Sequence, residues 1–121
     1  INKMLVYRLA HYRNSLATVI PQRVIERAPS AELRPDQTDQ DSLPPYPVLD
    51  AIMEAYVEGD ISPREIVAQG YAASDVERVV RLVRGSEYKR RQSPVGIRIP
   101  PRGFGKDWRF PITNKFRHQF D

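Results

Sequence analysis

The segment 29–45, PSAELRPDQTDQDSLPP, is the feature that most restricts how this chain can fold. It holds four carboxylates, four prolines and two serines, so it is too polar to bury and too rich in proline to form a helix. Connections between helices in a compact domain usually run about 2–8 residues. A segment of this length predicts either a solvated connector or a mobile acidic loop that closes over a ligand as a lid.

The chain as a whole has the size of one ordinary domain, with 121 residues. It opens at Ile1 inside a helical pattern, so we expect it to be part of a larger fold. No apolar run approaches the roughly 20 residues that span a bilayer, and no charged-then-apolar leader is present. Cysteine is absent, which excludes disulfides and thiolate metal sites. These features predict a cytoplasmic protein without membrane partners.

The net charge of +4 conceals an uneven distribution. Residues 1–83 hold nine Lys and Arg against twelve Asp and Glu, a balance of −3, whereas residues 84–121 hold ten against three, a balance of +7. A basic C-terminal segment is typical of proteins that bind phosphate, either on a nucleotide or on a nucleic acid.

Apolar spacing and helix-capping residues predict five short helices and therefore a mainly α-helical chain. The predicted ranges are 2–13, 21–28, 46–58, 63–69 and 75–92. Ser62 with Glu65 has the spacing of a capping box, and Ser74 with Glu77 repeats it. Gly59 is expected to end the third helix. The clearest buried stripe consists of Val76, Val79, Val80 and Val83.

The segment 93–121 has no sustained period, because prolines and glycines interrupt it, and VGIRI is its best strand-like pattern. Its large aromatic residues include Phe104, Trp108, Phe110 and Phe116. Such side chains would be costly to leave in water. We therefore expect an ordered but irregular basic tail that packs on a neighbouring element.

The run EYKRRQ allows two interpretations. In the first, the run is an ordinary charged helix end that tolerates alanine, because cations near a helix C-terminus interact favourably with the helix dipole. Alternatively, the ammonium group of Lys89 contacts an anionic ligand. His11 and His118 are isolated and lack the spacing of a metal site or a catalytic pair.

Three stretches in this order resemble the C-terminal part of bacterial glutamine-dependent NAD⁺ synthetases. They are NKMLVYRLAHYRN, PSAELRPDQTDQDSLPPYPVLDAI and EYKRRQSPVGIRIPPRGFGKDWRFPITNKF. The resemblance covers nearly the whole chain. Relatives that use only ammonia end soon after the segment equivalent to YKRR, so the long tail favours the branch that uses glutamine.

The resemblance implies a ligase reaction in two steps. ATP, with Mg²⁺, adenylates the nicotinate carboxylate of deamido-NAD⁺, and ammonia derived from glutamine then displaces AMP. The implied fold is the C-terminal end of an α/β adenine-nucleotide α-hydrolase-like domain, joined to an N-terminal glutaminase. Its Ser-Gly-Gly-x-Asp-Ser phosphate loop is absent from these residues, as is a glutaminase triad. We therefore expect no catalytic or metal-binding residue here and no activity of this piece alone.

The resemblance also implies individual contacts. Lys3 and Ser30 match residues that contact ATP, and Lys89 matches the lysine that contacts deamido-NAD⁺. Tyr88 stands where ammonia-only members carry histidine, and it would stack on the substrate or donate a hydrogen bond. Segment 29–45 corresponds to the lid. The expected partners are small-molecule substrates, the missing N-terminal parts and further copies in a homo-oligomer, without nucleic acid.

A different class of function stays open at this point. The basic tail would also suit a helical module that binds nucleic acid or another protein. The aromatic residues discriminate between the two, because RNA-binding platforms expose aromatics between cations, whereas a structural tail buries them.

Overall fold

The computed structural model describes residues 1–30, 33–103 and 105–116. The chain divides into two compact units, Ile1–Asp50 and Ala51–Asp121. Within the described ranges, every regular element is helical and no strand is present, so VGIRI remains without a strand partner. The prediction of a mainly α-helical chain is confirmed for this part of the molecule.

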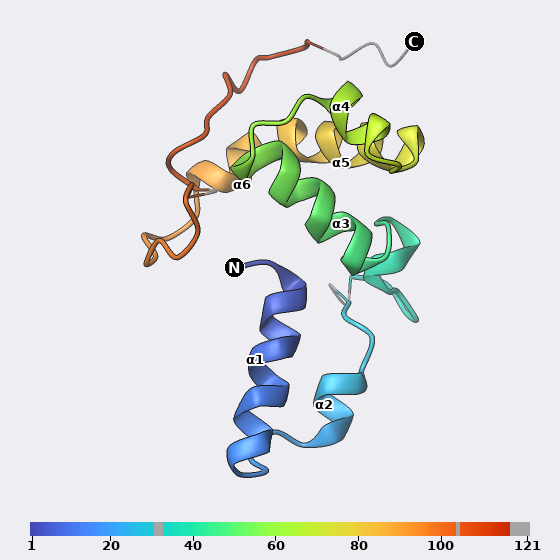
Figure 1. Ribbon diagram of the computed structural model, residues 1–121, viewed down its shortest axis with the longest axis vertical. Helices are drawn as coiled ribbons and strands as arrows, with labels where there is room; N and C mark the ends of the chain where they lie inside the picture. The colour runs from blue at the N-terminus through green and yellow to red at the C-terminus, as the bar shows by residue number, and fades with distance from the viewer. Residues whose placement is uncertain (31–32, 104, 117–121) are drawn as a thin grey trace. The chain divides into compact units, whose positions relative to one another are not determined.

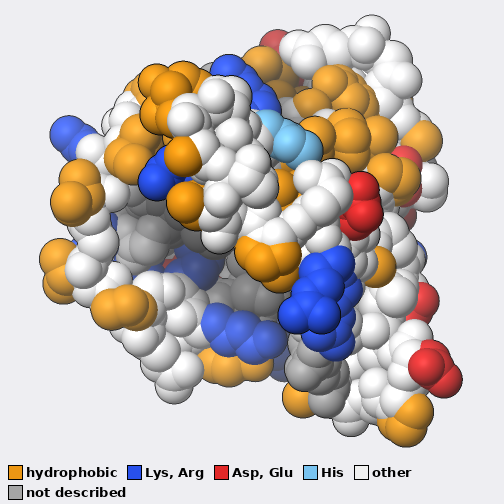
Figure 2. All heavy atoms as spheres, turned by 90° about the horizontal axis from the view of Figure 1, so that it is seen from below, with side chains coloured by type: hydrophobic (Ala, Val, Ile, Leu, Met, Phe, Trp, Pro, Cys, Tyr) orange, Lys and Arg blue, Asp and Glu red, His pale blue; other side chains and the backbone are white. Residues whose placement is uncertain are grey.

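In the described part of the first unit, which also holds residues 46–50 at the start of α3 (Tyr46–Met53), two α-helices and one short 3₁₀ helix lie complete (Figure 1). They are α1 (Lys3–Leu16), α2 (Gln22–Glu26) and η1 (Asp39–Asp41). No residue of α1 is buried, and the exposed large apolar side chains of this unit include Val6, Leu9, Leu16, Val19 and Val24. Figure 2 shows hydrophobic side chains on the molecular surface.

The second unit is built mainly from helices (Figure 1), which bury a small and mostly aliphatic core. The elements are α4 (Pro63–Ala68), α5 (Ala73–Gly85), α6 (Glu87–Arg91) and the π-helical turn η2 (Glu54–Glu58), which continues α3 (Tyr46–Met53). The core residues are Ile52, Tyr56, Val57, Ile66, Val76, Val79, Val80 and Val83. The predicted valine stripe of α5 is therefore buried as a whole.

One of the two predicted capping boxes is present. The Ser62 hydroxyl accepts a hydrogen bond from the Glu65 N–H at 3.3 Å, and the Glu65 carboxylate accepts one from the Ser62 N–H at 3.0 Å. The prediction for Ser74 is wrong. Helix α5 already begins at Ala73, with Ala72 as an N-cap that makes no side-chain hydrogen bond.

The helix that contains α3 and η2 ends at Gly59 as predicted, but not through a left-handed glycine. Gly59 keeps a right-handed conformation, with φ of −81°, and the left-handed residue is Asp60, with φ of 55°. A Cβ at Gly59 would lie 2.9 Å from the Ala55 carbonyl oxygen. Glycine is required here by space rather than by its dihedral angles.

The predicted helix 75–92 is interrupted. Gly85 has weak helix propensity, and Ser86 leaves the helical region with φ of −97° and ψ of 13°. The chain then resumes as the separate five-residue helix α6. Among the described residues, no helix is both long enough and apolar enough to cross a membrane.

Candidate functional site

Helix α6 has an inner and an outer face, although its sequence is almost uniformly polar. Glu87 and Arg90 are buried, with 2% and 4% of their surface exposed. Tyr88 is 49% exposed, and Lys89 is exposed beside it, with its Nζ 5.9 Å from the centre of the Tyr88 ring. Residues three apart on a helix share a face, so the inner pair leaves Tyr88 and Lys89 on the accessible side.

The Glu87 carboxylate is the centre of a buried charge cluster. It forms ion pairs with Arg90 at 3.1 Å, with Arg109 at 3.3 Å and with Arg91 at 3.4 Å. It also accepts a hydrogen bond from the backbone N–H of Phe110. Burial by itself raises the pKa of Glu87, but this hydrogen bond and the surrounding guanidinium groups outweigh it, so the pKa lies below its usual value.

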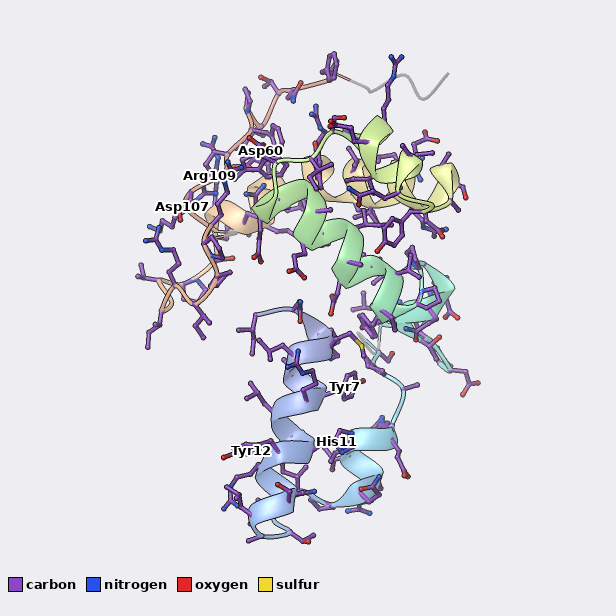
Figure 3. All side chains as sticks on the ribbon, in the orientation of Figure 1. Tyr7, His11, Tyr12, Asp60, Asp107 and Arg109 are labelled. Carbon is purple, nitrogen blue, oxygen red and sulfur yellow. The ribbon has the colours of Figure 1, made fainter. Side chains whose placement is uncertain are left out.

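The same cluster attaches the tail to α6. The Arg90 guanidinium donates a short hydrogen bond to the Trp108 carbonyl oxygen, and Arg91 donates to the Phe110 carbonyl oxygen at 3.3 Å. Arg109, labelled in Figure 3, supplies the reciprocal ion pair from the tail. The interpretation of EYKRRQ as a uniformly exposed charged helix end is therefore wrong for Arg90, which is a buried anchor.

Aromatic packing reinforces this attachment. The Trp108 ring contacts Tyr56 and Phe110 edge-on, with centroid distances of 4.8 and 4.6 Å. Arg84 lies over the rings of Phe110 and Phe116, although Phe116 is still 62% exposed. The expected packing of the tail is confirmed for Trp108 and Phe110. The expectation for Phe104 falls outside the described residues.

Lys3 occupies the first turn of α1, in the first unit. The helix start is fixed by the Asn2 side chain, which accepts from the Leu5 N–H at 2.9 Å, and by Asp50, which accepts from the Met4 N–H at 2.6 Å. The Lys3 ammonium lies 5.7 Å from the Tyr7 ring centre and 5.6 Å from that of Tyr46.

Figure 3 shows Tyr7 and His11 on one side of α1 and Tyr12 on the other. Lys3 shares the Tyr7 side, since it lies four residues earlier. Both distances are within the roughly 6 Å over which an ammonium group is attracted to an aromatic ring.

A series of contacts leads from Lys3 to the segment around Ser30. The Tyr46 hydroxyl donates a short hydrogen bond to the Asp39 carboxylate, and the Asp39 N–H donates to the Pro29 carbonyl oxygen at 2.9 Å. Ser30, partly exposed, follows directly. Burial and the hydrogen bond to Asp39 both raise the pKa of Tyr46.

The acidic loop has its own local order in the described residues. Asp41 closes a capping box on η1, accepting from the Thr38 N–H and from its hydroxyl, both at 2.9 Å. These two hydrogen bonds hold the pKa of Asp41 below its usual value. Asp36 adopts a left-handed conformation with φ of 56°, which aspartate tolerates better than most residues. Whether the loop moves as a lid stays a prediction.

The four residues predicted to contact substrates thus fall into two pairs, one in each unit. Lys3 and Ser30 belong to the first, and Tyr88 and Lys89 to the second. His11 is exposed, and His118 lies outside the described residues. Over the described ranges, no group of three or more His, Cys, Asp or Glu side chains could hold a metal ion.

Sequence reasoning did not predict the interactions that lie beside the two pairs of candidate residues. These are Glu87 with Arg90, next to Tyr88 and Lys89, and Asp39 with Tyr46, near Lys3 and Ser30. A signal existed only for Glu87, because it stands three residues before Arg90 on a predicted helix, the spacing of a helical ion pair. That spacing does not reveal burial.

Comparison with known proteins identifies the class to which these residues belong. The family model described as NAD synthase matches residues 1–93, which is most of the chain. The chain therefore belongs to the NAD synthase family.

Individual relatives agree with this assignment. A glutamine-dependent NAD⁺ synthetase from Aquifex aeolicus is 53% identical over 96% of this chain and 20% of its own length. One from Acinetobacter baylyi is 55% identical over 97% of this chain and 22% of its own. The chain thus spans about a fifth of the length of the curated relatives it matches.

The fold of the chain also matches part of a solved structure. It is the glutamine-dependent NAD⁺ synthetase of Acinetobacter baumannii in complex with adenosine diphosphate, and 46% of the aligned residues are identical. The TM-score is 0.57, and the match covers 94% of this chain and 19% of that one.

Proposed function

We propose that this chain works as the C-terminal part of the synthetase domain of a glutamine-dependent NAD⁺ synthetase. In the complete enzyme, an α/β nucleotide-binding domain carries the phosphate loop, and ATP with Mg²⁺ activates the carboxylate of deamido-NAD⁺. Ammonia released from glutamine then forms the amide. The names of the relatives and the family assignment support this reaction class. The nucleic-acid alternative has no comparable support.

In this proposal the chain contributes binding groups rather than catalytic ones. Lys3 and Ser30 contact ATP, and Lys89 contacts deamido-NAD⁺ beside Tyr88. The observation that carries the proposal is the placement of Lys89 and Tyr88 on the accessible face of α6, while Glu87 and Arg90 fix the opposite face. An exposed lysine on a fixed helix is preorganised for an anion, because its backbone does not need ordering when the ligand binds.

The ADP complex of the A. baumannii enzyme makes an adenine nucleotide a consistent ligand for this family. Lys3 is suited to it for a physical reason. Tyr7 and Tyr46 restrict the lysine chain through ring contacts, so less side-chain entropy remains to be lost on binding.

The test replaces Lys89 by alanine in the full-length enzyme. A lost charge-assisted hydrogen bond typically costs about 1.5–3 kcal/mol, which corresponds to roughly a 10- to 150-fold loss in kcat/KM. We expect this loss for deamido-NAD⁺ and a much smaller one for ATP, measured by varying each substrate at saturating concentrations of the other. Lys3→Ala should show the reverse preference.

A matched control is Lys106→Ala, which removes an exposed lysine from the tail of the same unit. We expect its kcat/KM for both substrates to stay within about twofold of wild type, as for most surface substitutions. Arg90→Ala is unsuitable as a control because Arg90 is buried. A folded Lys89→Ala enzyme with unchanged kcat/KM for deamido-NAD⁺ would refute the ligand role.

A further inference from the structure

We infer that the tail is a positioning element for the Tyr88–Lys89 pair. In this inference, which rests on the proposed function, the buried carboxylate of Glu87 locks residues 108–110 against the inner face of α6. The locked helix then presents Lys89 and Tyr88 to deamido-NAD⁺ in a fixed orientation. Glu87 touches no substrate and acts through its helix neighbours.

Helix α6 needs such a support because it is too short to be stable by itself. It contains five residues, Glu87–Arg91, and its N-cap, Ser86, makes no side-chain capping hydrogen bond. Isolated helices shorter than about 12–15 residues are marginal in water, because few hydrogen bonds offset the cost of nucleation. The helix is also separated from α5 by the break at Ser86. Its geometry must come from tertiary contacts.

The contacts that hold α6 come from both directions. From the helix, Arg90 donates to the Trp108 carbonyl oxygen and Arg91 to the Phe110 carbonyl oxygen. From the tail, the Phe110 N–H and the Arg109 guanidinium bind the Glu87 carboxylate. The three tail residues 108–110 therefore supply backbone acceptors, a backbone donor and a cation to one helical turn.

The tail is in turn fixed to the rest of its unit. The Trp108 ring packs on Tyr56, and the Tyr56 hydroxyl accepts a hydrogen bond from Arg84 of α5 at 2.9 Å. Earlier in the tail, Arg102 pairs with Asp60 at 3.2 Å. The tail therefore connects α6 to the buried core around α5 and η2. The orientation of α6 is fixed by this connection as well as by the interrupted helix.

The inner and outer faces of α6 belong to the same helical turn, so a change at the inner face also affects the residues proposed to bind the substrate. Tyr88 and Lys89 lie between Glu87 and Arg90 in the same turn, so a tilt of that turn moves them directly. Misplacement of a binding group by about 1 Å can cost on the order of 100-fold in rate. A weakened lock should therefore impair deamido-NAD⁺ use even when every substrate-contacting side chain is intact.

The experiment uses the full-length enzyme and the variant Glu87→Gln, which keeps the shape but removes the charge that holds the guanidinium groups. We expect the KM for deamido-NAD⁺ to rise about tenfold, less than for complete removal of the Lys89 contact, while the KM for ATP changes less than about twofold. Glu87→Asp, which retains the charge, should restore part of the affinity. A purely structural role would instead lower the fraction of active enzyme and leave both KM values unchanged.

A double-mutant cycle with Lys89→Ala tests whether Glu87 acts through Lys89. We expect the second substitution to add less than about threefold to the KM of the first, because coupled residues are not additive. If Lys89→Ala raises the KM for deamido-NAD⁺ and Glu87→Gln does not, the positioning role is overturned and the proposed function stands. If Lys89→Ala has no effect, the proposed contact fails and the inference fails with it.

Should Glu87→Gln not yield folded enzyme, Arg109→Ala tests the same lock from the tail. Arg109 is 31% exposed and pairs with Glu87, so its removal weakens the lock without leaving the carboxylate unpaired. A KM increase of about threefold for deamido-NAD⁺ alone supports the inference. Unchanged KM values in folded Arg109→Ala enzyme overturn it.

Discussion

The acidic loop, described over 29–30 and 33–45, and the basic tail, described over 93–103 and 105–116, are both rich in proline and mostly irregular, but they are held in different ways. The loop makes contacts within a few residues, such as Asp41 with Thr38, and these groups are exposed or only partly buried. The tail makes contacts to residues far away in sequence, such as Arg109 with Glu87, whose carboxylate is buried.

This difference teaches that irregular backbone and weak attachment are separate properties. A charge pair in water contributes little, because solvent screens it and side-chain entropy opposes it. A buried carboxylate surrounded by three guanidinium groups is different, since loss of the carboxylate removes the shared counter-ion of all three cations, including the buried Arg90. The tail is thus expected to be the rigid irregular segment, and the loop the one that opens at low cost.

The largest expected effect is the loss of the charge at the centre of the tail cluster. Glu87→Ala removes the carboxylate that pairs with the buried guanidinium of Arg90, and breaking a buried ion pair typically destabilises a protein by about 3–5 kcal/mol. Urea unfolding of the 121-residue chain, followed by the fluorescence of its single tryptophan, Trp108, measures this change.

The matched control removes an exposed ion pair of the same tail. Arg98 pairs with Asp107 at 3.1 Å, with the two side chains 63% and 37% exposed. Arg98→Ala should shift the urea midpoint far less than Glu87→Ala does. Similar shifts for the two variants would contradict the distinction between buried and exposed attachment.

The sequence predicted the parts of this molecule that depend on periodicity and local chemistry. The valine stripe of α5 is buried because branched side chains at helical spacing face one neighbour, and Ser62 caps α4 because its partner Glu65 is three residues away. The prediction failed at Ser74, because the helix already begins one residue before the serine, at Ala73.

The supports of the candidate site could not be predicted in this way. A run of five polar residues gives no apolar stripe, so nothing in EYKRR indicates that Glu87 and Arg90 point inward. Their tail partners lie 18 and 22 residues further along the chain. In the loop, Asp39 meets Tyr46 only because a 3₁₀ turn brings them together. Such pairings depend on tertiary structure.

An intermediate effect is expected from acid. The pKa of Glu87 is lowered in the folded chain, so its contribution to stability is complete above its unfolded value of about 4.5 and is lost as the pH falls through the lower folded value. The emission of Trp108 should therefore shift to longer wavelength below about pH 4.5 as the tail detaches. In Glu87→Gln the shift should already be present at neutral pH. An identical acid transition in both proteins would show that Glu87 does not hold the tail.

The smallest expected effect concerns the loop. Tyr46→Phe removes the hydroxyl that binds Asp39, a net loss of about 1 kcal/mol, so the open form of the loop should become roughly fivefold more populated. Cleavage after the exposed Asp36 of the loop by the protease Glu-C should accelerate by about the same factor when opening is fast relative to cleavage, and trypsin reports on the tail. Cleavage after Arg109 should keep its rate, because the tail has separate anchors.

The control is Tyr12→Phe, which removes an exposed hydroxyl from α1 and should change neither rate. Equal acceleration after Asp36 and Arg109 would mean that the two segments open together, and the contrast between them would be lost.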